Sequence, residues 1–276
     1  MQNPENHFHF GDIHMKDGGS FNIAGGNIVD NKNITSSRVC EYEGSVIADQ
    51  AKIDARSLMD STVKIYMNAG KDEEGKDTYI SKTGFFVSER GHILTCYHTG
   101  KEDLHKKKSE VIVKVIQNKK IYIYKSEQIE YLEGDQNLDY AILKLDTTKN
   151  ILPLGCKPVK AGQDWKDSKN YYSFCYVSSD KLLGTSITGI IAGITKVGKN
   201  SSIYDCITME GKAFLPGMSG SPVMNMKTDK VIGLISMGFT KRYFKSDKDG
   251  YHTRALAVQI EEIHKKSKLF RDIAKI

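Results

Sequence analysis

A glycine-flanked serine, Ser219, lies at the centre of the stretch Phe214-Leu215-Pro216-Gly217-Met218-Ser219-Gly220-Ser221-Pro222-Val223. Glycine adopts positive φ without steric cost and proline fixes its own φ, so this composition favours a tight turn after the apolar residues. A hydroxyl presented in such a turn is a candidate nucleophile. The competing interpretation is a serine in an ordinary turn, and the residues upstream decide between the two.

Two upstream segments carry the groups that a serine nucleophile needs. Thr95-Cys96-Tyr97-His98 ends an apolar strand pattern, and Asp139-Tyr140-Ala141-Ile142 opens another. A serine hydroxyl is almost never ionised near neutral pH, so attack on an amide carbonyl requires a base within hydrogen-bond reach. We expect His98 to be that base. Asp139 would fix the tautomer of the imidazole and stabilise the imidazolium, while staying ionised itself.

The order histidine, aspartate, serine is that of the chymotrypsin arrangement. From about residue 61 to its end, the chain resembles a trypsin/chymotrypsin-fold serine protease, in character an HtrA-like one without a PDZ domain. The resemblance implies a catalytic triad of His98, Asp139 and Ser219. Three further segments are similar to the hairpin that leads into the catalytic histidine and to two strands of the second barrel: 83–95, 188–194 and 231–238.

The pattern after residue 60 predicts an all-β fold. Short apolar strands alternate with turn residues at the spacing of a β-barrel or sandwich. With the resemblance, this predicts a double six-stranded β-barrel of chymotrypsin type, with barrel one at 61–150, barrel two at 160–258 and a C-terminal helix at 259–276. The cleft between the barrels would then have the histidine and aspartate on one side and the serine on the other.

Residues 1–60 are predicted to form a separate Gly-rich extension. Short apolar pairs alternate with glycine and asparagine between residues 7 and 35, which is typical of small hairpins. Residues 43–60 carry apolar residues among charges, which predicts a short helix against the barrel. We expect this extension to dock, to self-associate or to bind a regulatory partner; the alternative is a leader without structure.

Further site residues follow from the turn and from the resemblance. Gly217 has no side chain to obstruct its N–H, so this N–H and that of Ser219 can point at one place and form an oxyanion hole. The resemblance places Ser236 beside the carboxylate of Asp139 as a second hydrogen-bond donor. Secreted digestive relatives carry an aspartate at the position of Met218, and a newly cut N-terminus pairs with that aspartate to activate the enzyme. Met218 carries no charge, so activation through such an ion pair is not expected here.

The resemblance also implies how a substrate would bind. Ser236, Met237 and Gly238 resemble the strand edge on which an extended peptide pairs through its backbone, so the partner would be a stretched loop or tail of a protein. Ala213, six residues before the nucleophile, would lie at the bottom of the specificity pocket and offers no carboxylate to Arg or Lys. We therefore expect an uncharged, apolar side chain before the cleaved bond.

Charge and hydropathy exclude other classes of partner. The net charge of +6 comes from 40 basic and 34 acidic residues. The run Lys106-Lys107-Lys108 has no interleaved aromatic residues and is typical of a solvated loop, so no nucleic acid is expected. No apolar run approaches the roughly 20 residues that span a bilayer, and the first residues do not resemble a secretion signal. We expect a cytoplasmic protein without membrane contact.

Cysteine and histidine spacing argues against disulfides and metals. The five cysteines have no close paired spacing, which is typical of reduced thiols. His7, His9 and His14 could share a strand face but lack a neighbouring carboxylate or cysteine, so we expect no metal and no cofactor.

Together these observations predict a cytoplasmic serine endopeptidase that acts through an acyl-enzyme. Residues 1–60 or a partner would regulate it, in a bacterial defence or stress pathway. The alternative, from another class, is a protease-like fold that serves as a non-catalytic binding or scaffold module.

Overall fold

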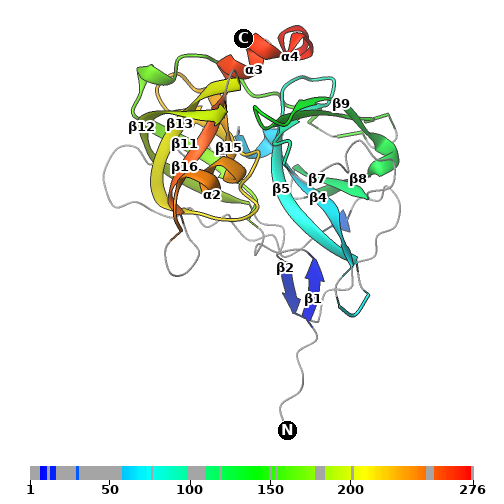
Figure 1. Cartoon of the computed structure of the whole chain (residues 1–276). Coiled ribbons are helices and arrows are strands. Elements are labelled where there is room, and N and C mark those ends of the chain that lie inside the picture. The colour runs from blue at the N-terminus through cyan, green and yellow to red at the C-terminus, as the bar shows by residue number, and fades with distance from the viewer. Residues whose placement is uncertain are drawn as a thin grey trace.

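Two barrel-like sheets lie side by side in the computed structural model, and the chain completes the first before it enters the second (Figure 1). The prediction of an all-β double barrel is confirmed. The structure describes the following residues: 7–10, 13–16, 29–30, 58–71, 73–75, 77–98, 110–117, 120–148, 151–152, 154–177, 184–199, 202–246 and 252–274.

The first sheet has eight antiparallel strands in the order β3-β8-β7-β4-β5-β6-β10-β9. Their bounds are β3 (Val29–Asp30), β4 (Thr62–Lys71), β5 (Asp77–Phe86), β6 (His92–Thr95), β7 (Val111–Gln117), β8 (Lys120–Lys125), β9 (Ile129–Asp135) and β10 (Tyr140–Leu145), with the 3-10 helix η1 (Ser126–Gln128) before β9. The prediction of six strands missed β9 and β3. Since β3 pairs with β8 through Val29 and Ile121, part of the predicted extension belongs to this sheet.

The second sheet is a closed barrel of six strands in the order β11-β12-β13-β16-β15-β14, as predicted. Its strands are β11 (Asn170–Cys175), β12 (Thr185–Lys199), β13 (Ser202–Phe214), β14 (Pro222–Asn225), β15 (Lys230–Ser236) and β16 (His252–Gln259), and the 3-10 helix η2 (Trp165–Asp167) precedes β11.

Near the N-terminus, β1 (His7–Phe10) and β2 (Ile13–Lys16) form a two-stranded antiparallel sheet. The helix predicted over 43–60 is described only at 58–61, where it is helical; the rest lies outside the described residues.

Two predictions about segment type are wrong. The strand expected to continue through Met237 and Gly238 ends at Ser236, and α2 (Met237–Tyr243) begins there. The hydroxyl of Ser236 accepts the N–H of Phe239 at 3.2 Å, which caps this helix. The single C-terminal helix is instead two helices, α3 (Ile260–Lys266) and α4 (Lys268–Ile273). They are separated at Ser267, whose hydroxyl accepts the N–H of Phe270 and caps α4.

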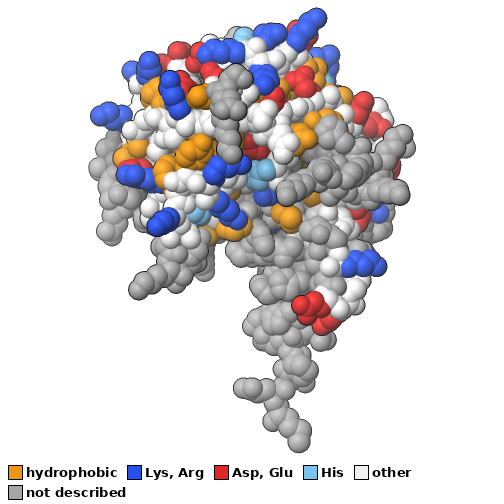
Figure 2. Space-filling model, in the orientation of Figure 1, with side chains coloured by type: hydrophobic (Ala, Val, Ile, Leu, Met, Phe, Trp, Pro, Cys, Tyr) orange, Lys and Arg blue, Asp and Glu red, His pale blue; other side chains and the backbone are white. Residues whose placement is uncertain are grey.

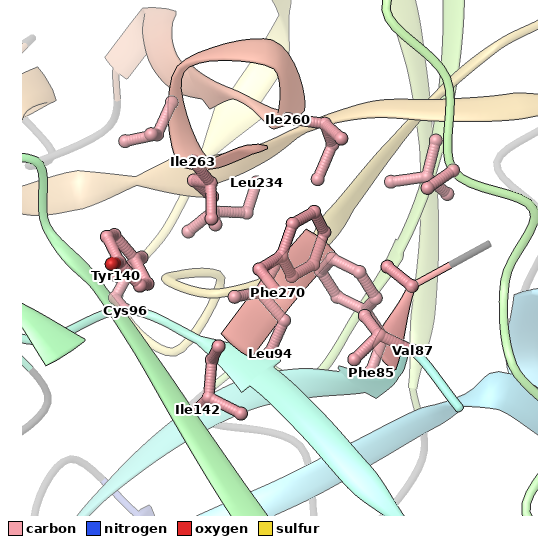
Figure 3. Close-up of a cluster of buried hydrophobic side chains, with 14 of the residues drawn as sticks. Phe85, Val87, Leu94, Cys96, Tyr140, Ile142, Leu234, Ile260, Ile263 and Phe270 are labelled. Atoms are coloured by element: carbon pink, nitrogen blue, oxygen red, sulfur yellow. The ribbon is translucent and has the colours of Figure 1, made fainter. Parts of the chain in front are cut away.

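The C-terminal helices join the two barrels through a shared hydrophobic cluster. Phe270 of α4 is fully buried, and around it lie side chains of both sheets (Figure 3). The labelled members from the first sheet, its connections and the second sheet are Phe85, Val87, Leu94, Cys96, Tyr140, Ile142 and Leu234. Truncating a buried phenylalanine to alanine costs about 3–5 kcal/mol, so this cluster is a substantial part of what fixes the barrels together.

Charged side chains of both signs lie close together along the top of the molecule, where α3 and α4 cover the sheets (Figures 1 and 2). An ion pair between Lys266 of α3 and Asp135 of β9, at 2.7 Å, adds a polar contact between the C-terminal helices and the first sheet. Among the described helices, none has the length and hydropathy needed to cross a membrane.

Candidate active site

Three side chains that are distant in the sequence meet where the barrels face each other. His98 follows β6, Asp139 directly precedes β10, and Ser219 lies between β13 and β14. The Nδ1 atom of His98 is 2.7 Å from Oδ2 of Asp139, and its Nε2 atom is 2.9 Å from Oγ of Ser219. The structure thus brings together the three residues that the sequence singled out, in one continuous line of hydrogen bonds.

Asp139 is held in an uncommon backbone conformation. Its φ is 58°, in the left-handed region that non-glycine residues seldom adopt outside sites where the surrounding structure imposes it. This conformation turns the carboxylate back to His98, whose backbone N–H donates to Oδ1 at 2.8 Å. The hydroxyl of Ser236 donates to Oδ2 at 2.5 Å, as the resemblance implied. Both carboxylate oxygens therefore accept hydrogen bonds from fixed donors.

Those donors decide the ionisation of Asp139. Burial by itself would raise the pKa of this carboxyl, because burial disfavours the charged form. The charge and hydrogen bonds of His98 and the hydroxyl of Ser236 outweigh burial and hold the pKa of Asp139 below its ordinary value. The carboxylate is therefore ionised at neutral pH and available to stabilise a positively charged imidazole.

Two consecutive turns present Ser219. In the first, the N–H of Met218 donates to the carbonyl of Leu215 at 3.2 Å, and Gly217 has a φ of 92°. Proline followed by a glycine of positive φ is the sequence signature of a type II turn. In the second, the N–H of Ser221 donates to the carbonyl of Met218 at 3.1 Å, and Gly220 has a φ of 85°. Local sequence alone is thus sufficient to bend the chain on both sides of Ser219.

Gly220 is required by the close approach of the two barrels. A Cβ atom at this position would lie 2.0 Å from the carbonyl oxygen of Thr83 in β5, so no side chain fits. The absence of a side chain lets the N–H of Thr83 donate to the carbonyl of Ser219 at 2.9 Å. The N–H of Gly220 donates to the carbonyl of Ile235 at 2.8 Å, which ties the same loop to β15.

The site is covered in this structure. Ser219 is 0% exposed, whereas the side chain of His98 is 29% exposed. The first turn of α2 lies against the imidazole, because a Cβ atom on Gly238 would be 3.1 Å from Nδ1 of His98. Met237 is buried at 2% exposure. The two residues predicted to extend a substrate-pairing edge are therefore helical, Met237 buried and Gly238 partly buried against His98.

The remaining predicted substrate residue, Ala213, lies near the end of β13 and is partly exposed. Cys96 also lies at the site, although it was not among the predicted site residues. Its Sγ donates to the carbonyl of Ile235 at 3.1 Å, next to the carboxylate of Asp139. No pattern in the sequence marks this contact, because it depends on the packing of β6 against β15.

Cys96, His98 and Asp139 offer ligand atoms within 4.8 Å of one another, the spacing of a metal site. The donor set does not fit a metal. Burial raises the pKa of the Cys96 thiol well above its ordinary value, and metals bind the thiolate. Both nitrogens of His98 already lie within hydrogen-bond distance of Asp139 and Ser219. The arrangement is suited instead to moving a proton between a hydroxyl and an imidazole.

Comparison with known proteins agrees with the fold. A family model described as a trypsin-like peptidase domain matches residues 82–234, a range that contains all three side chains. A crystal structure of Deg5 is similar over 81% of this chain and 95% of that chain, with a TM-score of 0.57 and 16% sequence identity. This likeness shows a shared fold. No curated protein matches the sequence.

Proposed function

Since the chain belongs to the trypsin-like peptidase family, we propose that it is a serine endopeptidase that cleaves protein substrates through an acyl-enzyme. The single observation that carries this proposal is the line of hydrogen bonds from Oγ of Ser219 through His98 to Asp139, with separations of 2.9 and 2.7 Å. These separations are those that proton transfer requires.

We assign one role to each side chain. Oγ of Ser219 attacks the scissile carbonyl carbon while Nε2 of His98 takes its proton. The imidazolium then gives this proton to the leaving amine, the amide C–N bond breaks, and an ester to Ser219 remains. Water, deprotonated by the same nitrogen, hydrolyses the ester and restores the hydroxyl. Asp139 stays ionised throughout, which its lowered pKa favours.

The oxyanion that forms during attack needs donors, and the turns around Ser219 supply candidates. We assign this role to the backbone N–H groups of Gly217 and Ser219. The positive φ of Gly217, 92°, supports the assignment because it sets the direction of the peptide that carries the Gly217 N–H relative to the chain that continues to Ser219, in a conformation that a residue with a side chain resists. Each such donor contributes roughly 2.7–4 kcal/mol to transition-state stabilisation in comparable enzymes.

For the substrate, we propose an uncharged, apolar side chain before the cleaved bond. Ala213 offers no carboxylate, and the next residue along β13, Phe214, belongs to a buried apolar cluster together with Met218 and Met237. A panel of peptides that differ only at that position tests this. Fastest cleavage after leucine or another apolar residue is the expected result, and fastest cleavage after arginine would contradict it.

We further propose that the resting protein is controlled by residues 1–60 or by a partner that binds them. The full burial of Ser219 supports this proposal, because a substrate can reach its hydroxyl only after the residues that bury it move. The free thiols of Cys96, Cys156, Cys175 and Cys206 are in keeping with a reducing compartment such as the cytoplasm. Action in a bacterial defence or stress pathway stays a prediction.

Hydrolysis of an unfolded protein substrate tests the enzymatic proposal. Purified protein, with and without residues 1–60, is incubated with casein alongside Ser219→Ala, His98→Ala and Asp139→Asn. We expect all three substitutions to lower cleavage by about 10⁴-fold or more. Equal cleavage by Ser219→Ala would show that a contaminant or another site is responsible. No cleavage by either form of the wild-type chain would favour the alternative, a non-catalytic scaffold.

A further inference from the structure

Thr83 connects the first barrel to both turns that present Ser219. It lies on β5 and is fully buried. Its backbone N–H donates to the carbonyl of Ser219 at 2.9 Å, and its hydroxyl donates to the carbonyl of Gly217, also at 2.9 Å. One residue of the first barrel therefore holds the two carbonyls on either side of the Met218–Ser219 peptide.

The direction of the Thr83 hydroxyl is fixed by its other neighbours. The N–H of Tyr176 donates to Oγ1 at 2.9 Å and so occupies one of its lone pairs. The hydroxyl proton then has two carbonyls within reach, that of Gly217 at 2.9 Å and that of Tyr176 at 3.4 Å. The shorter contact is the stronger hydrogen bond. A β-branched side chain with few rotamers and no exposure keeps this arrangement rigid.

The backbone carbonyl of Thr83 also has a hydrogen-bond partner. Its carbonyl accepts the hydroxyl of Thr95, in β6, at 2.7 Å. The N–H, the carbonyl and the hydroxyl of Thr83 all have partners, and two of these partners lie in the loop of the nucleophile. Such a fully satisfied buried network is stiff, because each group that moves loses a hydrogen bond that water does not replace.

We propose that Thr83 is a positioning residue for the oxyanion hole, acting through its hydroxyl. The N–H of Ser219 belongs to the peptide between the two held carbonyls, and the carbonyl of this peptide accepts the N–H of Ser221 at 3.1 Å. With both flanking carbonyls held by Thr83, a change in the direction of this N–H costs hydrogen bonds of the loop. Gly217 and Gly220 leave this loop little stiffness of its own, because glycine passes between backbone regions that other residues avoid. The inference rests on the proposed serine peptidase activity and assigns it one further residue.

The test compares three substitutions at Thr83 with one elsewhere. Thr83→Val keeps the shape and the backbone N–H but removes the hydroxyl, Thr83→Ser keeps the hydroxyl, and Thr83→Ala removes it without adding bulk. Thr62→Val is the matched control, because Thr62 is also a fully buried threonine that donates to a carbonyl, that of Leu58 at 2.6 Å, away from the nucleophile. Circular dichroism and thermal unfolding establish that each variant is folded.

Steady-state hydrolysis of an apolar peptide separates positioning from general damage. We expect Thr83→Val to lower kcat about 10- to 100-fold with little change in KM, because the lost alignment matters only in the transition state. The affinity for a peptide aldehyde ending in leucinal, whose adduct places an oxyanion in the hole, falls by the same factor. Thr83→Ser returns kcat to within about threefold of wild type, and Thr62→Val leaves it unchanged.

A spectroscopic readout complements the kinetics. In the fluorophosphonate adduct of Ser219, the phosphoryl oxygen occupies the oxyanion hole, so its ³¹P chemical shift reports the donors directly. We expect the shift to differ from wild type in Thr83→Val and to be restored in Thr83→Ser. Should Thr83→Val fail to fold, the pair Thr83→Ala and Thr83→Ser carries the same comparison.

The outcomes distinguish this inference from the function on which it rests. If wild type is labelled at Ser219 and Thr83→Val matches it in kcat, aldehyde affinity and chemical shift, the positioning role is overturned and the peptidase stands. Equal impairment of Thr83→Ser and Thr83→Val, or of Thr62→Val, also overturns it, because the hydroxyl would then not be the cause. If wild type is neither labelled nor active, both proposals fall.

Discussion

The hydroxyl of Ser236, at the end of β15 in the second barrel, donates to Oδ2 of Asp139, which precedes β10 of the first, at 2.5 Å. The same oxygen atom of Asp139 is 2.7 Å from Nδ1 of His98. A carboxylate that aligns the imidazole is therefore held by donors from both barrels. Ser236 also caps α2, so the position of that helix and the orientation of the carboxylate depend on one side chain.

Ser236→Ala is expected to lower kcat about 10-fold, because Asp139 loses a donor that orients it, while the other contacts of His98 remain. Ser173→Ala is the control: the buried Ser173 hydroxyl has no hydrogen-bond partner among the described residues. Peptide hydrolysis by the two variants, compared at saturating substrate, measures the difference. An unchanged kcat in Ser236→Ala would show that His98 alone is sufficient to orient the carboxylate.

The ionisation of Asp139 predicts how stability depends on pH. Because the folded protein lowers the pKa of this carboxyl, its contribution to stability is complete above the unfolded value of about 3.9 and is lost as pH falls through the lower folded value. The difference in unfolding free energy between wild type and Asp139→Asn should therefore shrink as pH is lowered from about 6 to about 3. Urea unfolding at several pH values measures it, and a constant difference would refute the coupling.

Gly238→Ala tests the contact between α2 and the imidazole. The added methyl would lie 3.1 Å from Nδ1 of His98, closer than nearly all real contacts of this kind, so the ring must shift by a few tenths of an ångström. We expect kcat/KM to fall about 10-fold with thermal stability nearly unchanged. Lys241→Ala, an exposed position on the same helix, should retain full activity. Unaltered hydrolysis by Gly238→Ala would mean that α2 moves away before catalysis.

Much of the site follows from local sequence. Pro216, Gly217 and Gly220 favour the two turns around Ser219, and contacts with Thr83 and Ile235 then hold these turns in place. His98 and Asp139 lie near the ends of strands, and the apolar residues beside them in the sequence indicate these strands. The sequence could single out these three positions because each lies in a turn or at a strand end that its immediate neighbours indicate.

What could not be predicted depends on distant contacts. Met237 and Gly238 continue an apolar run, yet α2 begins there because Thr240 connects two segments: its hydroxyl donates to the carbonyl of Ser236 at 2.8 Å and accepts the N–H of Leu256 at 3.0 Å. Strand β9 (Ile129–Asp135) was missed because three acidic residues and a glycine interrupt its apolar residues at a partly exposed edge of the sheet. The hydroxyl contact of Thr83 with Gly217 spans two barrels and leaves no periodic signal.

Lys114 gives a second pH dependence, of the same direction but at alkaline pH. Burial lowers the pKa of this side chain, whose ammonium lies over the ring of Tyr66, to about 8. Between about pH 8 and 9.5 the unfolded chain binds more protons than the folded one, so unfolding free energy should rise with pH. Lys114→Met should remove this rise, whereas Lys268→Met, at an exposed position of α4, should keep it. If the unfolding free energy of Lys114→Met still rose over this pH range, another titrating group would be the cause.

The central claim is that Oγ of Ser219 is a nucleophile activated by His98. Reaction with a fluorophosphonate probe, followed by mass spectrometry of the peptide that carries the adduct, tests this most directly. We expect a single adduct on Ser219, absent from Ser219→Ala and formed far more slowly by His98→Ala. A wild-type protein that stays unlabelled both with and without residues 1–60, or one that is labelled elsewhere while Ser219 remains free, would contradict the account.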